Sequence, residues 1–157
     1  MAIEIERKFL INNNDYKAES YTSYPIKQGY ISTNKNSAVR IRITDKKGFI
    51  TIKGKSNTSG TSRFEWEKEI PKSDAESLFL LCEKGVIEKV RYLIKQGNHI
   101  FEVDEFHGEN KGLLIAEIEL TEENETFEKP IWLGKEVTGK VAYYNAYLSE
   151  HPFKNWK

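Results

Sequence analysis

The chain lacks most features that mark secreted or membrane-spanning proteins. Of its 157 residues only Cys82 is a cysteine, so no disulfide bond can form within the chain. The longest aliphatic run, residues 78–81, is far too short to span a bilayer, and no apolar leader precedes the first charged segment. We therefore expect a cytoplasmic protein without a membrane partner, folded as a single domain over residues 1–157.

An excess of either charge is also absent. The 24 Lys and Arg residues balance the 24 Asp and Glu residues, which argues against a nucleic acid bound by bulk charge. The three histidines show no ligand-pair spacing, and the chain has no glycine-rich loop of the Walker or dinucleotide type. A conventional nucleotide-binding fold is therefore not expected.

The chain is rich in short segments in which apolar and polar residues alternate, which is typical of β-strands with two different faces. These segments are residues 2–11, 26–32, 38–44, 49–55, 62–70, 87–96, 99–106 and 113–120. Turn-forming residues at 45–48 and 96–98 predict tight hairpins. Eight strands joined by short turns predict a mostly antiparallel sheet.

Three helices are expected beside these strands. Pro71 and a capping box at residues 73–76 begin the clearest one, whose apolar stripe ends at Gly85. Further helices are expected near residues 137–149 and, as a short turn, near 15–20. The expected fold class is mainly β (α+β), with a few helices packed on the sheet.

The first strand carries the most informative spacing in the chain. Glu4, Glu6 and Lys8 alternate with apolar residues, so in an extended segment they share one face. Two neighbouring carboxylates repel each other unless a cation lies between them, and a divalent metal ion is the usual solution. This spacing therefore predicts a metal site.

Other strands repeat the alternation, with their charges sorted by sign. Acidic pairs are Glu65 and Glu67, Glu102 and Asp104, and Glu117 and Glu119, and basic pairs are Arg40 and Arg42, Lys53 and Lys55, and Lys89 and Arg91. For any one strand, a solvated outer face explains the pattern. It explains the whole set poorly, because like charges side by side are unfavourable. A face selected only for solubility would instead alternate acidic and basic residues. The sorting favours a functional concave surface.

A sheet curled with these charges inside would enclose a nearly charge-balanced space. Eight strands are about the number at which a closed barrel holds packed side chains or one small ligand. Arginines and lysines on several strands suit an anion with many oxygens. Carboxylates without a Cys or His cluster suit a hard ion such as Mg²⁺ or Mn²⁺. The sequence therefore predicts a site for a metal-bound polyphosphate.

Several short motifs follow one another along almost the whole chain. They occupy residues 4–8, 28–30, 40–42, 51–54, 63–67, 89–91, 102–104, 116–120 and 136–139. In this order and spacing they resemble the CYTH superfamily, also called triphosphate tunnel metalloenzymes, and within it the single-domain bacterial inorganic triphosphatases. The resemblance implies an eight-stranded antiparallel closed β-barrel that forms a tunnel with a charged interior.

The resemblance also implies roles for individual residues, with glutamates binding Mg²⁺ or Mn²⁺ and basic residues clamping a triphosphate. The metal candidates are Glu4, Glu6, Glu65, Glu67, Glu117 and Glu119, and the substrate candidates are Lys8, Arg40, Arg42, Lys53, Lys89 and Arg91. Glu4, Glu6 and Lys8 are also the catalytic candidates. Asp104 would serve either the metal or the orientation of a basic residue.

One departure from the family pattern lies near the C-terminus. Similar proteins commonly carry an acidic and then a basic residue shortly before a Tyr-Asn pair, whereas here Lys140, Val141 and Ala142 precede Tyr143, Tyr144 and Asn145. Ala142 cannot supply a basic side chain to a phosphate. Whether Lys140 replaces it is left open.

The activity implied by the resemblance is metal-dependent hydrolysis of a triphosphate-containing small molecule, with inorganic tripolyphosphate cleaved to phosphate and pyrophosphate. The alternatives are a class IV-like adenylyl cyclase, a thiamine triphosphatase and a non-catalytic polyphosphate or nucleotide sensor. The first two need a site for an organic group, and the sequence shows no unambiguous one. The protein is expected to act as a monomer or homodimer.

Overall fold

Nine β-strands dominate the computed structural model, which describes residues 3–156. They are β1 (Ile3–Ile11), β2 (Thr22–Ser32), β3 (Ser37–Thr44), β4 (Lys47–Ser56), β5 (Ser62–Ile70), β6 (Glu83–Gln96), β7 (His99–Phe106), β8 (Leu114–Glu119) and β9 (Leu133–Glu136). The eight strands expected from alternation are confirmed, and hairpin turns lie within residues 45–48 and 96–98. Ala2, part of the first expected strand, lies outside the described residues, as do Met1 and Lys157.

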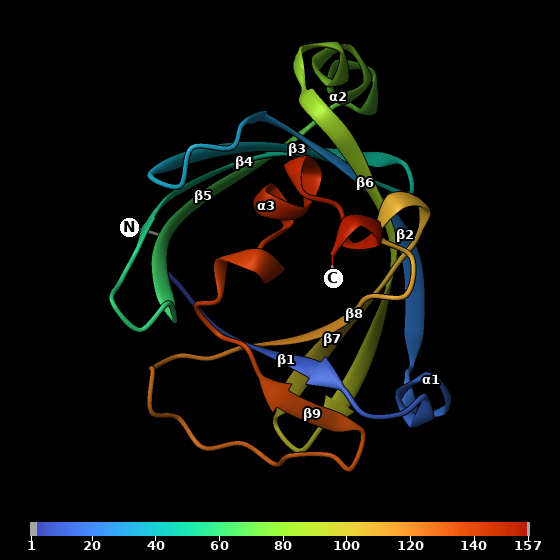
Figure 1. Ribbon diagram of the computed structural model, residues 1–157, viewed down its shortest axis with the longest axis vertical. Helices are drawn as coiled ribbons and strands as arrows, with labels where there is room; N and C mark the ends of the chain where they lie inside the picture. The colour runs from blue at the N-terminus through green and yellow to red at the C-terminus, as the bar shows by residue number, and fades with distance from the viewer. Residues whose placement is uncertain (1–2, 157) are drawn as a thin grey trace.

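The strands close into an eight-stranded antiparallel barrel, as predicted. Hydrogen bonds join them in the order β5-β4-β3-β2-β6-β7-β8-β1, and the beginning of β1 pairs with β5 to complete the ring. The end of β1 pairs instead with β9, a short strand outside the ring. Figure 1 shows the strands as a ring around the C-terminal part of the chain.

Two strands start earlier than expected. β2 begins at Thr22 and β6 at Glu83, ahead of the expected starts at residues 26 and 87. A proline such as Pro25 usually excludes a central strand, because it cannot donate to the ladder. Here Pro25 pairs with β6 but lies beyond the part of β2 that pairs with β3. It is tolerated because one side of β2 has no partner strand there.

The helix α2 (Lys72–Leu78) is shorter than expected and begins differently. Pro71 is its N-cap residue, Ser73 lies inside the helix and no side chain makes a capping hydrogen bond, so the predicted capping box is wrong. The predicted end at Gly85 is also wrong, because a 3₁₀ turn, η1 (Phe79–Leu81), leads directly into β6. Pairing of β6 with β2 outweighs the helical pattern of the apolar residues.

The other helical elements are short. They are α1 (Asp15–Glu19), η2 (Gly108–Asn110), η3 (Val141–Tyr143), α3 (Asn145–Glu150) and η4 (Phe153–Asn155). The short helix expected near residues 15–20 is confirmed by α1. The single helix expected near 137–149 is wrong, because the backbone is extended at Tyr144 and separates η3 from α3.

The main apolar core lies outside the barrel wall. Phe9, Phe101 and Ile118 on the outer faces of β1, β7 and β8 are buried together with Tyr16 of α1 and Trp132. The rings of Phe101 and Trp132 meet edge to face, with centroids 5.3 Å apart. The segment between β8 and β9, together with α1, therefore covers the apolar outer face of these strands.

A second, smaller core lies at one end of the barrel interior. Ile87, Phe106 and Ile115 point inward from their strands and pack with Leu148 of α3, against which Phe153 also packs. Residues 137–156, here called the C-terminal segment, thereby fill this end of the barrel, as Figure 1 shows in red. The charged part of the interior adjoins this apolar layer.

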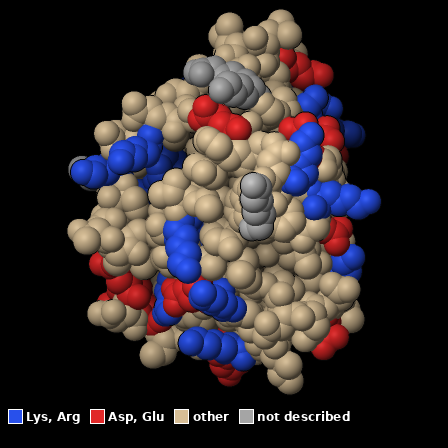
Figure 2. All heavy atoms as spheres, in the orientation of Figure 1, with Lys and Arg blue, Asp and Glu red and all other residues tan. Residues whose placement is uncertain are grey.

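In the described part of the chain, no helix combines the length and the apolar character needed to cross a membrane. Seen from the end that the C-terminal segment fills, basic and acidic side chains lie interspersed around a largely uncharged middle (Figure 2). This face of the molecule carries no broad patch of one sign.

Candidate functional site

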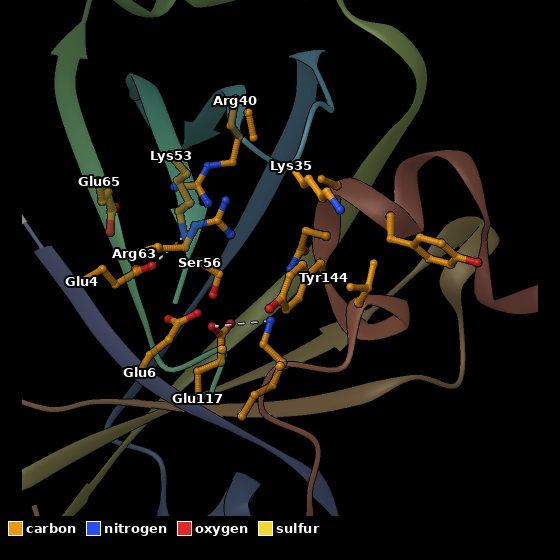
Figure 3. Close-up of a pocket in the computed structure, with 18 of the residues that line it drawn as sticks. Glu4, Glu6, Lys35, Arg40, Lys53, Ser56, Arg63, Glu65, Glu117 and Tyr144 are labelled. Carbon is orange, nitrogen blue, oxygen red and sulfur yellow. Dashed lines mark hydrogen bonds and ion pairs between the residues drawn. The ribbon is translucent and has the colours of Figure 1, made fainter. Parts of the chain in front are cut away.

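The charged residues of the barrel strands meet in one cavity (Figure 3). It has a volume of about 790 Å³ and is lined by all eight barrel strands and by the C-terminal segment. The lining includes every site residue predicted from the sequence: Glu4, Glu6, Lys8, Arg40, Arg42, Lys53, Glu65, Glu67, Lys89, Arg91, Glu117 and Glu119. They converge because alternate residues of each strand face the same side of the sheet.

Carboxylates from three adjacent strands lie side by side on one part of the lining. Glu6 of β1 is opposite Glu119 of β8, and Glu65 of β5 hydrogen-bonds with Glu4 on the other side of β1. Figure 3 shows the carboxyl groups of Glu6 and Glu117 close to each other inside the cavity. We call this group the acidic wall, comprising Glu4, Glu6, Glu65, Glu117 and Glu119.

Crowding in the acidic wall shifts the pKa values of its members. Burial, followed by the nearby Glu117 and Glu4, raises the pKa of Glu6 well above its ordinary value. Burial and the hydrogen bond with Glu4 raise the pKa of Glu65 to about 7. Burial also acts to raise the pKa of Glu4, but Lys53, whose Nζ lies 2.9 Å from Oε1, lowers it overall. Carboxyl groups that retain protons to avoid mutual repulsion are suited to exchanging them for a metal cation.

The chemistry of these donors fits a hard divalent ion. Neither His nor Cys is among the described residues that line the cavity, and carboxylate oxygens are the ligands that Mg²⁺ and Mn²⁺ prefer. No three acidic, His or Cys side chains in residues 3–156 converge as a ready metal site. The carboxyl groups are instead paired, Glu4 with Glu65 and Glu6 with Glu117. Binding a metal ion would therefore require these pairs to separate.

Lys8 lies where the acidic wall meets the C-terminal segment. Its Nζ is 3.9 Å from Glu117, donates to the Tyr143 carbonyl at 3.4 Å and lies 5.2 Å from the centroid of the Tyr144 ring. Burial acts to lower the pKa of Lys8, but Glu117 and Glu6 raise it overall. Burial likewise acts to raise the pKa of Glu117, but Lys8 brings it down to about 2. This pair therefore presents a charged ammonium group to the cavity.

Cations from three other strands form what we call the basic wall, comprising Arg40, Arg42, Lys53, Lys89 and Arg91. Arg40 donates from Nη2 to Thr51 at 3.1 Å, but its Nε is buried and has no hydrogen-bond partner among the described residues. Burial, followed by the neighbouring Arg40 and Arg91, lowers the pKa of Arg42 to about 10. A buried unused donor and crowded positive charge fit an anion with several oxygens.

Asp104 of β7 holds two of these cations. Its Oδ2 lies 2.7 Å from Lys89 Nζ, and its two oxygens accept hydrogen bonds from Arg91 at 2.8 and 3.0 Å. Burial acts to raise the pKa of Asp104, but Arg91 and Lys89 lower it far below its ordinary value. Asp104 is not among the described lining residues. Its geometry thus fits the orientation of basic residues rather than metal binding.

Sequence reasoning missed several residues that line the cavity. They are Tyr30, Lys35, Ser56, Arg63, Tyr144 and Asn145. Arg63 donates from Nε and Nη2 to the Gly54 carbonyl, and its place two residues before Glu65 on the same face was a usable signal. Lys35 lies in a loop and Tyr144 in the C-terminal segment, where no periodicity indicates which side chains face inward.

A family model described as the CYTH domain matches residues 2–146. The chain belongs to the CYTH domain family. The resemblance recognised from the motifs is therefore confirmed.

Relatives within the CYTH family match over nearly their whole length. A protein of Acetivibrio thermocellus named inorganic triphosphatase is 49% identical over 158 residues, which cover 100% of this chain and 99% of the relative. One of Nitrosomonas europaea with the same name is 34% identical over 150 residues, which cover 93% and 96%. The crystal structure of the inorganic triphosphatase NE1496 has a TM-score of 0.65 at 31% identity and covers 93% of this chain and 97% of that chain.

The departure from the CYTH pattern near the C-terminus leaves no basic side chain at the cavity from this stretch. Lys140 is exposed and is not among the described residues of the lining. The C-terminal segment of this CYTH chain instead presents Tyr144 and Asn145 to the cavity.

Proposed function

We propose that this chain hydrolyses inorganic tripolyphosphate to phosphate and pyrophosphate with the help of a divalent ion, Mg²⁺ or Mn²⁺. The observation that carries the proposal is the single cavity in which the acidic wall and the basic wall meet. A polyphosphate complexed with a metal ion has the matching chemistry, because its oxygens suit the basic wall and its cation suits the carboxylates. The names of the two relatives support the same activity.

Phosphoryl transfer depends mainly on positioning and charge neutralisation, since the protein contributes little covalent chemistry. Lys8 and the basic wall hold the phosphate oxygens, with the unused Nε of Arg40 available to one of them. The residues that would hold the metal are Glu4, Glu6, Glu65, Glu67, Glu117 and Glu119. When bound, the metal supplies charge neutralisation at the phosphate and a template for the substrate. Lys8 or a glutamate of the acidic wall orients the attacking water.

Substrates with an organic group would need a platform for it, and the three indole rings do not provide one at this cavity. Trp132 is buried in the outer core, Trp66 lies on the outer face of β5, and Trp156 packs against Phe153. Because no indole ring lies at the cavity and both relatives are named inorganic triphosphatase, we place tripolyphosphate ahead of ATP and thiamine triphosphate. We further propose a cytoplasmic monomer or homodimer without nucleic-acid or membrane partners. The balanced charge of the chain supports the absence of a nucleic-acid partner.

A substrate panel tests the proposal. Tripolyphosphate, ATP and thiamine triphosphate are each incubated with the protein and Mg²⁺, Mn²⁺ or EDTA, and phosphate, pyrophosphate and cyclic AMP are measured separately. We expect equal amounts of phosphate and pyrophosphate from tripolyphosphate, the highest kcat/KM for this substrate, and no products with EDTA. Cyclic AMP from ATP would identify a cyclase instead, and binding of tripolyphosphate without turnover would identify a sensor.

Two charge-removing variants test the metal side. Glu4→Gln and Glu119→Gln should each lower kcat/KM by about 100-fold or more, because several kcal/mol of charge stabilisation depend on the metal. Glu88→Gln on β6 is the matched control, since Glu88 is exposed and is not among the described lining residues. Full activity in the first two variants would contradict the assignment of these carboxylates.

A further inference from the structure

Two amide side chains connect the basic wall to the C-terminal segment. Gln28 of β2 is fully buried, its Oε1 accepts from Arg42 Nε at 3.0 Å, and its Nε2 donates to Asn145 Oδ1 at 3.0 Å. The same oxygen of Asn145 accepts from Lys89 Nζ at 2.9 Å. A continuous chain of hydrogen bonds therefore runs from Arg42 through Gln28 and Asn145 to Lys89.

Arg42 sets the direction of the hydrogen bonds in this chain. A guanidinium group only donates, so Arg42 must meet the carbonyl oxygen of Gln28. The amide nitrogen of Gln28 is then left to donate to Asn145. A carboxylate at position 28 could still accept from Arg42 but would have no N–H for Asn145.

Lys89 depends on these contacts because the protein surrounds it. Its residue is only 2% exposed, and its Nζ lies between Asp104 on β7 and Asn145 on α3. Asp104 belongs to the barrel wall, whereas Asn145 belongs to the C-terminal segment. The position of this cation is therefore set jointly by the barrel and by the segment that fills its end.

We propose, on the basis of the proposed function, that Gln28 and Asn145 form an amide relay that positions Arg42 and Lys89 for the triphosphate. Asn145 is then a positioning residue that acts through Lys89. The C-terminal segment, which lacks a basic side chain at Ala142, takes part in substrate binding through this relay.

Variants at the two amides test the relay. Asn145→Ala removes the oxygen that accepts from Gln28 and from Lys89. Gln28→Glu keeps the side-chain shape and the contact with Arg42 but removes the N–H group that donates to Asn145. Asn145→Ala should lower kcat/KM for tripolyphosphate about tenfold, the effect of losing one hydrogen bond to a charged group. Gln28→Glu should lower it by a similar factor, because it sets a carboxylate against the carbonyl oxygen of Asn145. Because both substitutions act through one relay, kcat/KM of the double variant should lie within about threefold of that of Asn145→Ala. In a Lys89→Met background, Asn145→Ala should change kcat/KM by less than about threefold.

Ser149→Ala is the matched control for a general loosening of the C-terminal segment. Ser149 lies on the same helix, is buried and donates only to the Ala146 carbonyl among the described contacts. The kcat/KM of Ser149→Ala should stay within about twofold of that of the unmodified protein, because the hydrogen bond of Ser149 lies within the C-terminal segment. If Ser149→Ala lowered kcat/KM as much as Asn145→Ala, the relay would be overturned. It would also be overturned if the double variant lowered kcat/KM by about 100-fold, the product of two independent tenfold effects. The isosteric Gln28→Glu keeps the test valid if Asn145→Ala unfolds.

The same variants are also compared by the Kd for tripolyphosphate, measured by calorimetry without a metal ion. Tight binding without turnover after Mg²⁺ or Mn²⁺ is added would overturn the proposed hydrolysis, while non-additive changes in Kd would still support the relay. If the protein hydrolyses tripolyphosphate but the effects of the two substitutions on Kd are additive, the relay is overturned and the proposed hydrolysis stands.

Discussion

Glu6 is half-buried beside the carboxyl groups of Glu4 and Glu117, and this crowding would couple the proposed binding of a metal ion to protons. The pKa of Glu6 is raised well above its ordinary value, first by burial and then by these neighbours, and that of Glu65 is raised to about 7 by burial and Glu4. Glu65 therefore retains its proton at mildly acid pH, and Glu6 holds its proton more strongly than an ordinary glutamate does. The proposed metal ion would bind the deprotonated carboxylates, so protons would compete with it.

Metal binding is thus expected to release protons and to tighten as the pH rises from about 6 to about 8. Calorimetric titration with Mn²⁺ in buffers of different ionisation enthalpy measures the number of protons released. Glu65→Gln should release fewer protons per ion, because it removes one of the carboxyl groups whose pKa is raised. Affinity that does not change over this pH range would contradict the expectation.

Asp104 links the basic wall to the stability of the fold. Burial acts to raise its pKa, but Arg91 and Lys89 lower it far below its ordinary value, whereas an unfolded Asp titrates at about 3.9. The unfolded chain therefore binds more protons than the folded one as the pH falls below about 4. The ionised group contributes stability above that pH, and the contribution is lost as the pH falls further.

Asp104→Asn should lower the free energy of unfolding at neutral pH by about 3 to 5 kcal/mol, because it removes the carboxylate that two buried cations share. It should also weaken the loss of stability below about pH 4. Urea unfolding at a series of pH values measures both effects. Glu109→Gln is the control, since it removes an exposed ion pair with Lys154, 2.8 Å long, and should cost less than about 1 kcal/mol. Equal losses in the two variants would contradict this account.

Among the elements, the loop between β4 and β5 is pressed against the C-terminal segment. Gly60 has a φ of +79°, and a Cβ added there would lie 2.3 Å from the Cα of Gly139, whose φ is +80°. On another side of the loop, Ser59 and Thr61 donate to the carboxylate of Glu123. These contacts hold in place a loop that contributes to the lining of the cavity.

Gly60→Ala is expected to destabilise the protein more than Gly108→Ala. Both positions have positive φ, 79° and 61°, so both alanines incur about 1 to 2 kcal/mol of backbone strain. Nothing lies within 4 Å of a Cβ at position 108, whereas the clash at position 60 should add about 1 to 3 kcal/mol. Urea unfolding compares the two variants. Similar losses would show that the loop yields to the extra methyl group.

The eight barrel strands could be predicted because the alternation of apolar and polar residues lies within each strand and does not depend on its tertiary contacts. β9 could not, since Leu133–Glu136 is only four residues long and becomes a strand by pairing with β1. The predicted end of α2 at Gly85 is wrong for a related reason. Residues after Leu78 continue a helical stripe of apolar side chains, but pairing between β6 and β2 prevails.

The same reasoning separates the predictable part of the site from the rest. Residues such as Glu4 and Arg40 face inward because a strand turns alternate side chains to one side. Asn145 and Tyr144 carry no such signal. Their approach to the cavity depends on the packing of the C-terminal segment against Ile87 and the rest of the second apolar core, which is a long-range contact.

In the molecule as a whole, the barrel is closed by a short seam between β1 and β5. In the described residues these strands pair at three positions, whereas β2 and β6 pair at eight. Glu4 of β1 and Glu65 of β5 flank the seam and hydrogen-bond across it. A metal-bound substrate would therefore contact both sides of the weakest closure.

Hydrogen exchange measured by mass spectrometry should detect this seam. Amides of residues 62–64 should exchange faster than those of the ladder between β2 and β6, because fewer paired residues must open. Mn²⁺ with tripolyphosphate should slow exchange at the seam by joining its two sides. In Glu4→Gln that slowing should be lost. Equal exchange in both ladders of the unliganded protein would contradict the expectation.

The barrel keeps its apolar side chains mainly on the outside and at one end, and reserves most of its interior for charge. A ligand that contacts both walls therefore completes the interior much as a core side chain does elsewhere. Its presence at about 100 times Kd would add about 2.7 kcal/mol to the free energy of unfolding. Substrate supply would then govern how long each molecule escapes proteolysis, so that a cell rich in the substrate keeps more of the protein.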